Sequence, residues 1–195
     1  MRRFYIGVDL GQVNDYTAFT IIERSGKEYH LRHIERPQRG TTYPNIVARL
    51  KELTETPELT GSVITLVVDV TGVGRPVWDL IKAVRMRVNL QGISITGGNT
   101  VNRDRDIYTV PKRDRVSSLQ VAFQNGELKI AKGLPDGDTL VKELTNFKVK
   151  ISASGHDQYE AWREGIHDDL VLSAAMAIWM SKQNSFAENF HALIS

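Results

Sequence analysis

The order of apolar runs along the first half of the chain constrains the fold most strongly. Three β-rich runs come first, at Phe4–Leu10, Tyr16–Arg24 and Glu28–Arg36, and only short turns separate them. Runs spaced so closely predict an antiparallel meander. The stretch FYIGVDLGQVNDYTAFTII spans the first two runs and places an acid, Asp9, at the end of the first strand.

Helices and strands alternate after the meander. The patterns predict a helix at Pro44–Glu55, a strand buried on both faces at Ser62–Val70, a helix at Pro76–Met86 and a short strand at Gln91–Thr96. Crossover helices of this kind make the later strands parallel to the first. We therefore predict an α/β, RNase H-like fold: a central mixed sheet of five or more strands, three antiparallel and then parallel ones, flanked by helices.

Both of these helices show apolar residues at helical spacing, which predicts a buried stripe on each. The stripe of the first helix consists of Ile46, Val47, Leu50 and Leu53. The stripe of the second consists of Val77, Leu80, Ile81 and Val84.

The second half of the chain is more polar. We expect a loop or hairpin at Gly97–Arg115, a helix at Asp114–Asn125, an edge strand at Glu127–Lys132, a helix at Thr139–Phe147, an extended segment at Lys148–Ser152 and a long alanine-rich helix at Asp168–Lys182. The stretch after Asn184 is expected to fray or to dock.

The composition suits one domain. With 195 residues and 41% apolar content the chain can bury one good core, so we expect a single domain over residues 1–195 with a core at about 4–182. A net charge of +2 suits a polyanionic partner but decides little. Cysteine is absent, which excludes disulfides and thiolate metal sites. No apolar run is long enough to span a bilayer, so we expect a cytoplasmic protein without a membrane partner.

Acidic residues occur where the predicted elements should meet. Asp9 ends the first strand and Asp69 ends the fourth, and these two strands are neighbours in an RNase H-like sheet. Asp168 and Asp169 begin the long helix that should cover the sheet, where the free N–H groups stabilise anions. Clustered carboxylates repel one another unless a cation neutralises them, and hard divalent cations prefer oxygen ligands. At least one acid of the pair is expected to serve only as a helix cap.

Three motifs together resemble a known family. IGVDLGQVNDYTA, VVDVTGVGRPVWDLI and GIHDDLVLSAAMA, in this order, are similar to the acidic motifs of the C-terminal nuclease domain of the phage large terminase subunit. The resemblance implies an endonuclease that cuts duplex DNA, concatemeric viral DNA during genome packaging, with two divalent ions, Mg²⁺ or Mn²⁺. It implies as metal ligands and catalytic residues Asp9, Asp69 and one or both of Asp168 and Asp169, with Asp15 as an auxiliary ligand.

A complete large terminase also contains an ATPase motor with a GxxxxGK[ST] loop, and the sequence has no such stretch. We therefore expect either an excised nuclease domain or a stand-alone relative. As part of a full terminase, it would have as partners the motor domain, the small terminase subunit and the portal, in the cytoplasm of the host.

Basic residues near the predicted site are candidates for contact with double-stranded DNA. Arg75 lies beside the second acidic motif, and the segment Arg103–Arg115 carries more basic than acidic residues together with Tyr108. Contacts to the DNA backbone dominate such affinity. The candidates are Arg75, Arg103, Arg105, Lys112 and Arg113.

Other functions share parts of this pattern. Actin-like ATPases begin with a similar hairpin, but they usually need two lobes and a second phosphate hairpin, which the sequence lacks. A transposase usually places glutamate on the last helix, where this chain has aspartates. A Holliday-junction resolvase has similar acids and is not excluded by chemistry. An inactive DNA-binding module is the remaining alternative.

Overall fold

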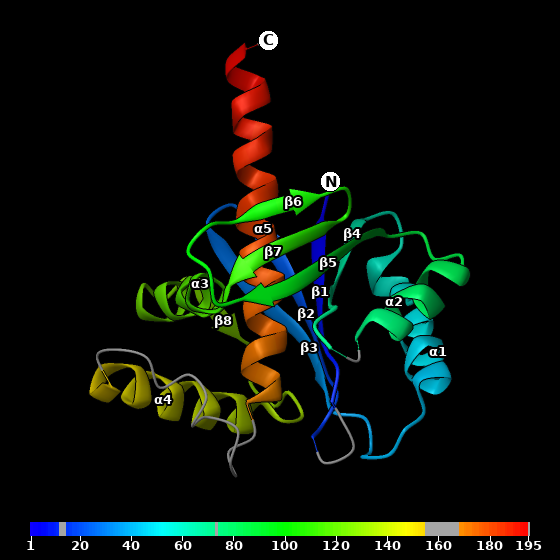
Figure 1. Ribbon diagram of the computed structural model, residues 1–195, viewed down its shortest axis with the longest axis horizontal. Helices are drawn as coiled ribbons and strands as arrows, with labels where there is room; N and C mark the ends of the chain where they lie inside the picture. The colour runs from blue at the N-terminus through cyan, green and yellow to red at the C-terminus, as the bar shows by residue number, and fades with distance from the viewer. Residues whose placement is uncertain (12–14, 73, 155–167, 195) are drawn as a thin grey trace.

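A computed structural model describes residues 1–11, 15–72, 74–154 and 168–194, without the side chains of 112, 147–154 and 186–194. The strands are β1 (Arg3–Asp9), β2 (Ala18–Ser25), β3 (Glu28–Glu35), β4 (Val63–Asp69), β5 (Asn89–Thr96), β6 (Asn102–Asp104), β7 (Ile107–Pro111) and β8 (Leu128–Ile130). The helices are α1 (Tyr43–Thr54), the short 3₁₀ helix η1 (Pro57–Leu59), α2 (Gly74–Ala83), α3 (Lys112–Gln124), α4 (Gly137–Ser154) and α5 (Asp169–Ile194), as Figure 1 shows.

Within the described ranges, the strands form one eight-stranded sheet with the order β6-β7-β5-β4-β1-β2-β3-β8. β1, β2 and β3 pair antiparallel, whereas β4 and β5 run parallel to β1. The predicted mixed sheet is confirmed, with β3-β2-β1-β4-β5 as its centre. The segment predicted as a loop or hairpin forms the β6–β7 hairpin and extends one edge, and β8 forms the predicted strand at the other edge.

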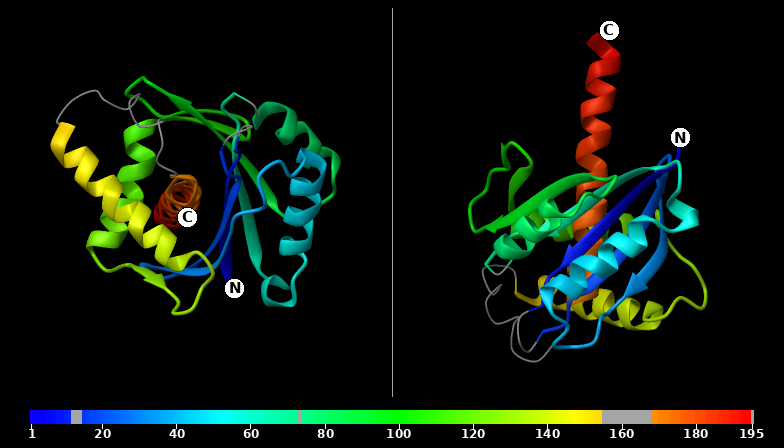
Figure 2. Two further views of the ribbon diagram at one scale, coloured as in Figure 1. Left: turned by 90° about the horizontal axis from the view of Figure 1, so that it is seen from below. Right: turned by 90° about the vertical axis from the view of Figure 1, so that its right-hand side faces the viewer.

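Helices cover both faces of the sheet, as the left panel of Figure 2 shows. The alternation along β1 decides which side chains face which layer. Phe4, Ile6 and Val8 pack in one apolar core with the buried stripes of α1 and α2. Tyr5 faces the opposite core, which α3, α4 and α5 cover. The molecule thus has three layers, with the sheet in the middle.

Helix α5 lies very close to β1 and β2. The Ser173 hydroxyl donates to the Gly7 carbonyl at 2.8 Å and shares a 2.9 Å hydrogen bond with the Thr20 hydroxyl. A Cβ at Gly7 would come within 2.0 Å of the Ser173 carbonyl oxygen, so only glycine fits there. Two turns later Arg24 donates to the Ser181 carbonyl at 2.5 Å. These two anchors align α5 along β1 and β2.

Two predictions about helix length are wrong. Lys148–Ser152 was expected to be extended, but α4 continues through it to Ser154. Neither glycine nor proline interrupts the chain between Thr139 and Ser154, so nothing ends the helix, and alternation over five residues is a weak signal. Helix α5 likewise continues past Lys182 to Ile194, and its last turns extend beyond the sheet (Figure 1).

The predicted stripe of α1 is confirmed, but that of α2 is partly wrong. Val77 and Ile81 are buried as expected, together with Trp78, whereas Leu80 is 39% exposed. The helix begins at Gly74 and turns the broad Trp78 ring toward the sheet, which moves Leu80 to the outer side. None of the helices in the described ranges is both long enough and apolar enough to cross a bilayer.

Candidate active site

The two strand-end acids lie side by side on the face that α5 covers. Val8 of β1 pairs with Val68 of β4 in parallel register, so Asp9 and Asp69 occupy neighbouring positions at the same edge. The alternation along β4 places Val67 in the core on the α5 side and Val68 in the opposite core. Asp69 therefore points to the α5 side, and by the same alternation so does Asp9. The predicted neighbourhood of these two acids is confirmed.

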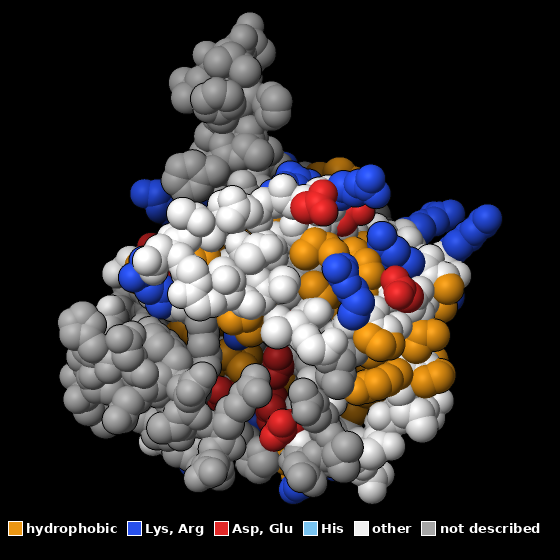
Figure 3. Space-filling view, viewed as in Figure 1, with side chains coloured by type: hydrophobic (Ala, Val, Ile, Leu, Met, Phe, Trp, Pro, Cys, Tyr) orange, Lys and Arg blue, Asp and Glu red, His pale blue; other side chains and the backbone are white. Residues whose placement is uncertain are grey.

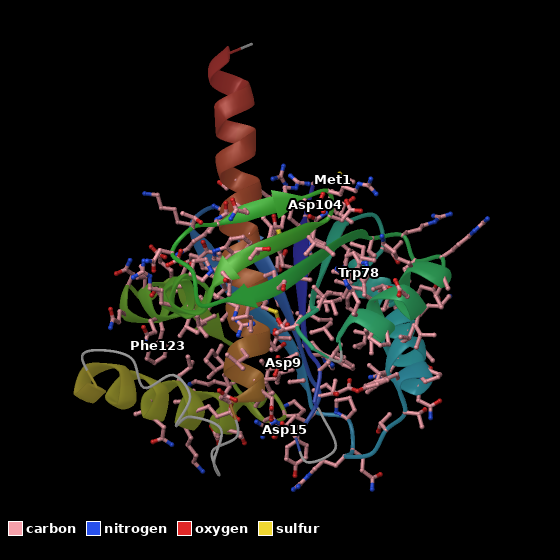
Figure 4. All side chains as sticks on the ribbon, viewed as in Figure 1. Met1, Asp9, Asp15, Trp78, Asp104 and Phe123 are labelled. Carbon is pink, nitrogen blue, oxygen red and sulfur yellow. The ribbon has the colours of Figure 1, made fainter. Side chains whose placement is uncertain are left out.

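The position of Asp169 follows from the anchors of α5. Ser173 contacts Gly7 near the end of β1. Ser181, later in the helix, contacts Arg24, which pairs with Arg3 at the start of β1. Helix α5 therefore runs antiparallel to β1. Four residues of helix span about 6 Å. Two residues of strand span about 7 Å. One turn before Ser173, the start of α5 therefore lies above the end of β1, and Figure 4 shows Asp9 beside this end of the helix.

Asp168 and Asp169 have different roles in the helix. The Asp168 carbonyl accepts the first helical hydrogen bond, from the Leu172 N–H at 2.9 Å, so Asp168 is the cap residue of α5. Asp169 is the first residue within α5 and is 5% exposed. Its Oδ2 is buried without a hydrogen bond among the described residues and lies 3.6 Å from the guanidinium of Arg36.

A buried ion pair supports the start of α5. Glu143 of α4 pairs with Arg36, which follows the end of β3. The other carboxylate oxygen of Glu143 accepts from the Val171 N–H at 3.3 Å. Glu143 thereby satisfies one of the free N–H groups at the beginning of α5. Arg36 and Glu143 together fix the direction in which Asp169 enters the site.

Asp69 is held at both oxygens. The Thr71 N–H donates to Oδ1 at 2.8 Å, and Nη1 of Arg115 donates to Oδ2 at 3.1 Å. Arg115 lies on α3 and is 1% exposed. Its Nε and Nη2 are buried and have no hydrogen-bond acceptor in the described part of the chain. A cationic side chain thus lies within the acid cluster itself.

Burial, followed by repulsion from neighbouring acids, raises the pKa values of Asp9 and Asp169. Burial and the neighbouring Asp69 carboxylate raise the pKa of Asp9 well above its usual range, although the charge of Arg115 opposes them. Burial raises the pKa of Asp169 to about 6, against the effect of Arg36. Burial likewise raises the pKa of Glu143 to about 7. Such shifts mean that burial, with a smaller effect of the neighbouring carboxylates, disfavours the charged forms of these three acids.

The donor set fits a hard divalent cation. Carboxylate oxygens are the ligands that Mg²⁺ and Mn²⁺ prefer, and the buried Oδ2 of Asp169 has no hydrogen bond to give up. In Figure 3 acidic side chains gather in a hollow of this face. Within the described ranges, no three His, Cys, Asp or Glu side chains already converge closely enough to hold a metal ion. Instead Asp69 pairs with Arg115, and Arg36 lies next to Asp169.

Asp15, the predicted auxiliary acid, lies at the same end of the sheet. It is exposed, it follows β1 after a short segment, and Figure 4 shows it beyond Asp9. Its charge helps to raise the pKa of Asp169, so it lies within electrostatic reach of the cluster.

The basic candidates occupy two places in the fold. Arg75 is exposed at the start of α2, next to the end of β4. Arg113 is exposed at the start of α3, after Lys112, whose side chain lies outside the described part. Both helix starts lie at the edge of the sheet where the acids are.

The hairpin arginines lie farther away. Arg103 pairs with Tyr108, which pairs with Ile93, which pairs with Asp69, so three strand steps separate Arg103 from Asp69. At about 4.8 Å a step, this is roughly 14 Å along the sheet. Arg105 lies in the exposed turn of the hairpin, where it accepts a 2.8 Å hydrogen bond from Arg103 at its carbonyl oxygen.

The sequence reasoning missed three residues around the acids. Arg36 and Glu143 lie outside the acidic motifs, and Arg115 lies at the end of the basic segment Arg103–Arg115 but not among its candidates for DNA contact. A usable signal existed for Arg115: it precedes the buried Leu119 and Ala122 by four and seven residues, so it lies on the buried stripe of α3. Glu143 similarly lies between the buried Leu140 and Leu144 of α4.

The strand order and the acid positions define the class of the protein. A β3-β2-β1-β4-β5 sheet, with acids at the ends of β1 and β4 under the start of the last helix, is an RNase H-like architecture. The described ranges form one sheet with its covering helices and do not contain the second lobe that an actin-like ATPase needs.

The chain belongs to the family described as the terminase RNaseH-like domain, whose model matches residues 6–181. The large terminase subunit of Thermus phage G20c is 29% identical over 174 residues, which cover 89% of this chain and 31% of that protein. The chain therefore spans about a third of the length of this relative. The resemblance of the chain to the large terminase nuclease domain is thus confirmed.

Solved structures agree with this assignment. The large terminase nuclease from phage G20c, solved with bound magnesium, is 26% identical with a TM-score of 0.61, and the match covers 91% of this chain and 80% of that one. The manganese-soaked, inhibitor-bound terminase nuclease domain of human cytomegalovirus is 12% identical with a TM-score of 0.60, covering 92% and 82%. At that identity, the second likeness shows the fold alone.

Proposed function

We propose that this chain is a metal-dependent endonuclease that hydrolyses phosphodiester bonds of duplex DNA. The observation that carries the proposal is the meeting of Asp9 and Asp69 on one face of the sheet, under the acidic start of α5. The neighbouring carboxylates that raise the pKa of Asp9 have no evident structural use, but acids gathered in this way favour the binding of divalent cations.

The residues proposed to hold the metal ions are Asp9, Asp69, Asp168 and Asp169, with Asp15 as an auxiliary acid. Two bound Mg²⁺ or Mn²⁺ ions would activate a water molecule and stabilise the departing 3′ oxygen. Other residues of the chain would orient these metal ligands. Thr71 and Arg115 hold the Asp69 carboxylate, and Arg36 with Glu143 holds the start of α5. A covalent protein nucleophile is not needed.

DNA is proposed to approach over the exposed helix starts. Arg75 and Arg113 lie at the acid edge, and together with Lys112, which precedes Arg113 in the chain, they are proposed to contact phosphates near the cut. Arg103 and Arg105 of the hairpin are proposed to contact the duplex some distance along it. Such contacts fix position and carry little sequence preference.

The biological setting is proposed from the relatives, which are large terminase subunits. We propose that the domain cuts concatemeric viral DNA during packaging in the cytoplasm of the host. Its partners there would be an ATPase motor domain, the small terminase subunit and the portal. Since this chain spans about a third of such a relative, packaging by the chain alone is not proposed.

Incubating supercoiled plasmid with the purified chain tests the nuclease directly. We expect nicked and linear products with Mn²⁺ or Mg²⁺, and none with EDTA. A four-way junction offered beside linear duplex distinguishes a resolvase, which would prefer the junction. Equal cleavage in EDTA contradicts the metal site, and DNA binding without any cleavage in either metal would identify an inactive DNA-binding module.

A companion experiment concerns nucleotides. The chain has no GxxxxGK[ST] loop, so we expect no heat of ATP binding in calorimetry and no ATP hydrolysis. Tight ATP binding would contradict this expectation and restore the actin-like alternative.

A further inference from the structure

Arg115 occupies an unusual position for an arginine. It lies on the buried face of α3 with Leu119 and Ala122, and its side chain is 1% exposed. A buried ion pair is rarely more stable than well-packed apolar residues of the same size. Stability therefore does not explain an arginine here, and a role in the site does.

The contact with Asp69 fixes the orientation of that carboxylate. Nη1 of Arg115 donates to Oδ2, while the Thr71 N–H donates to Oδ1. Each oxygen keeps a further lone pair, because a carboxylate offers about four acceptor positions. Thr71 and Arg115 thus hold the Asp69 carboxylate, and the remaining lone pairs of its oxygens are available to a cation. Partners that hold metal ligands in this way typically change metal affinity or activity by about 10- to 100-fold.

The charge of Arg115 also acts on the rest of the cluster. Of the described charges that act most strongly on Asp9, only Arg115 is positive, whereas Asp69, Asp168 and Asp169 are negative. The guanidinium keeps two further buried donors, Nε and Nη2, that lack an acceptor in the described part. Unpaired buried donors are rare in folded proteins, and these two are free to bind an ordered water or an acceptor that enters the site.

We propose that Arg115 is a positioning residue of the nuclease site, which orients Asp69 and supplies the positive charge of the acid cluster before a divalent cation binds. The inference rests on the proposed function. It assigns to α3, the helix that directly follows the β6–β7 hairpin, a part in preparing the site.

The test compares Arg115→Gln with Arg115→Lys, using Arg32→Gln as a matched control. Arg32 of β3 pairs with Glu23 of β2, and the Arg32 side chain is 49% exposed, so the same substitution removes an arginine from an ion pair outside the site. For each protein we measure the Tm in EDTA and in saturating Mn²⁺, and the kcat and KM for plasmid nicking in Mn²⁺.

Arg115→Gln should lower the Tm in EDTA by about 10 °C, because it leaves Asp69 buried and unpaired. Mn²⁺ should remove most of this difference, since the cation replaces the lost charge. The kcat should fall about 10- to 100-fold with little change in KM. Arg115→Lys should recover much of the Tm but not the kcat, because an ammonium lacks the planar fork of arginine. Arg32→Gln should resemble the wild type throughout.

Two results would overturn the inference: a wild-type kcat in Arg115→Gln, or a Tm deficit that is equal in EDTA and in Mn²⁺, which would indicate packing alone. If Arg115→Gln does not fold, a wild-type kcat in Arg115→Lys has the same meaning. A wild-type chain that neither cleaves nor gains stability in Mn²⁺ would instead refute the proposed function.

Discussion

The acid edge of β1 and β4 and the β6–β7 hairpin belong to one sheet but differ in burial. At the acid edge three charged residues are enclosed, because Asp69, Asp169 and Arg115 have exposed fractions of 8% or less. On the hairpin, Arg103 and Arg105 are exposed, and Arg103 contacts the Arg105 carbonyl and the Tyr108 ring of the same hairpin. Electrostatic interactions between charged groups are strong where water is excluded and weak where water surrounds the groups. We therefore assign chemistry to the acid edge and contact with DNA to the hairpin and helix starts.

The largest expected effect comes from the acid edge. Asp69→Asn removes a proposed metal ligand and should lower the nicking rate by about 1,000-fold or more, because metal catalysis contributes several kcal/mol. Binding of a DNA duplex, measured by fluorescence anisotropy in Ca²⁺, should change little. Asp79→Asn, at an exposed acid of α2, is the matched control and should cleave normally. Near-normal cleavage by Asp69→Asn would refute the assignment.

The support around Asp169 should give a smaller effect. Arg36→Gln leaves Glu143 without its ion pair and frees the start of α5, so we expect the nicking rate to fall about 10- to 100-fold. Arg2→Gln, which breaks a partly buried ion pair with Glu23 outside the acid cluster, serves as its control. If both variants lose activity equally, or neither does, Arg36 does not orient the acid.

The hairpin should affect affinity and leave the chemistry intact. Arg103→Gln should weaken duplex binding by a few-fold and reduce the slope of log affinity against log salt by about 1, as expected for one phosphate contact. The nicking rate at saturating DNA should not change. Lys27→Gln removes one positive charge from the exposed β2–β3 turn and should leave the salt slope unchanged. An unchanged slope in Arg103→Gln would exclude the hairpin from the DNA interface.

The smallest effect concerns the pH dependence of stability. The pKa values of about 6 for Asp169 and about 7 for Glu143 lie above the value of about 4 that carboxyls have in unfolded chains. The folded state therefore binds these protons more tightly, and the stability that they contribute is lost as the pH rises through 6 and 7.

In EDTA the Tm should thus fall by several degrees between pH 5 and pH 8, and Mn²⁺ should restore much of it at pH 8. The lowered pKa values of Glu23 and Glu35 act below this window and do not interfere. Differential scanning fluorimetry across the range measures the effect. A Tm that rises with pH in EDTA would contradict the described electrostatics.

The two regions also differ in how well the sequence predicted them. Asp9 and Asp69 could be placed because strand alternation and element order decide their face and neighbours. The hairpin could be anticipated only as a loop or hairpin, since β6 has three residues and takes its register from β7. Lys148–Ser152 shows the limit of short patterns, because its alternation did not prevent α4 from continuing.

The partners of the acids were harder to predict. Arg115 and Glu143 lie on helices whose faces toward the core are otherwise apolar, and local sequence does not show what lies opposite a buried charge. Arg36 is adjacent to a strand end and meets Glu143 across more than a hundred residues of chain. Such pairs depend on how α3, α4 and α5 pack, which is decided by the whole fold.

The most direct measurement is the position of manganese in crystals of this chain soaked in Mn²⁺, located by anomalous scattering. The account predicts strong peaks between Asp9, Asp69 and the acidic start of α5, with carboxylate oxygens as ligands. No peak at this edge, or a peak elsewhere while the crystallised protein still cleaves DNA in Mn²⁺, would contradict it.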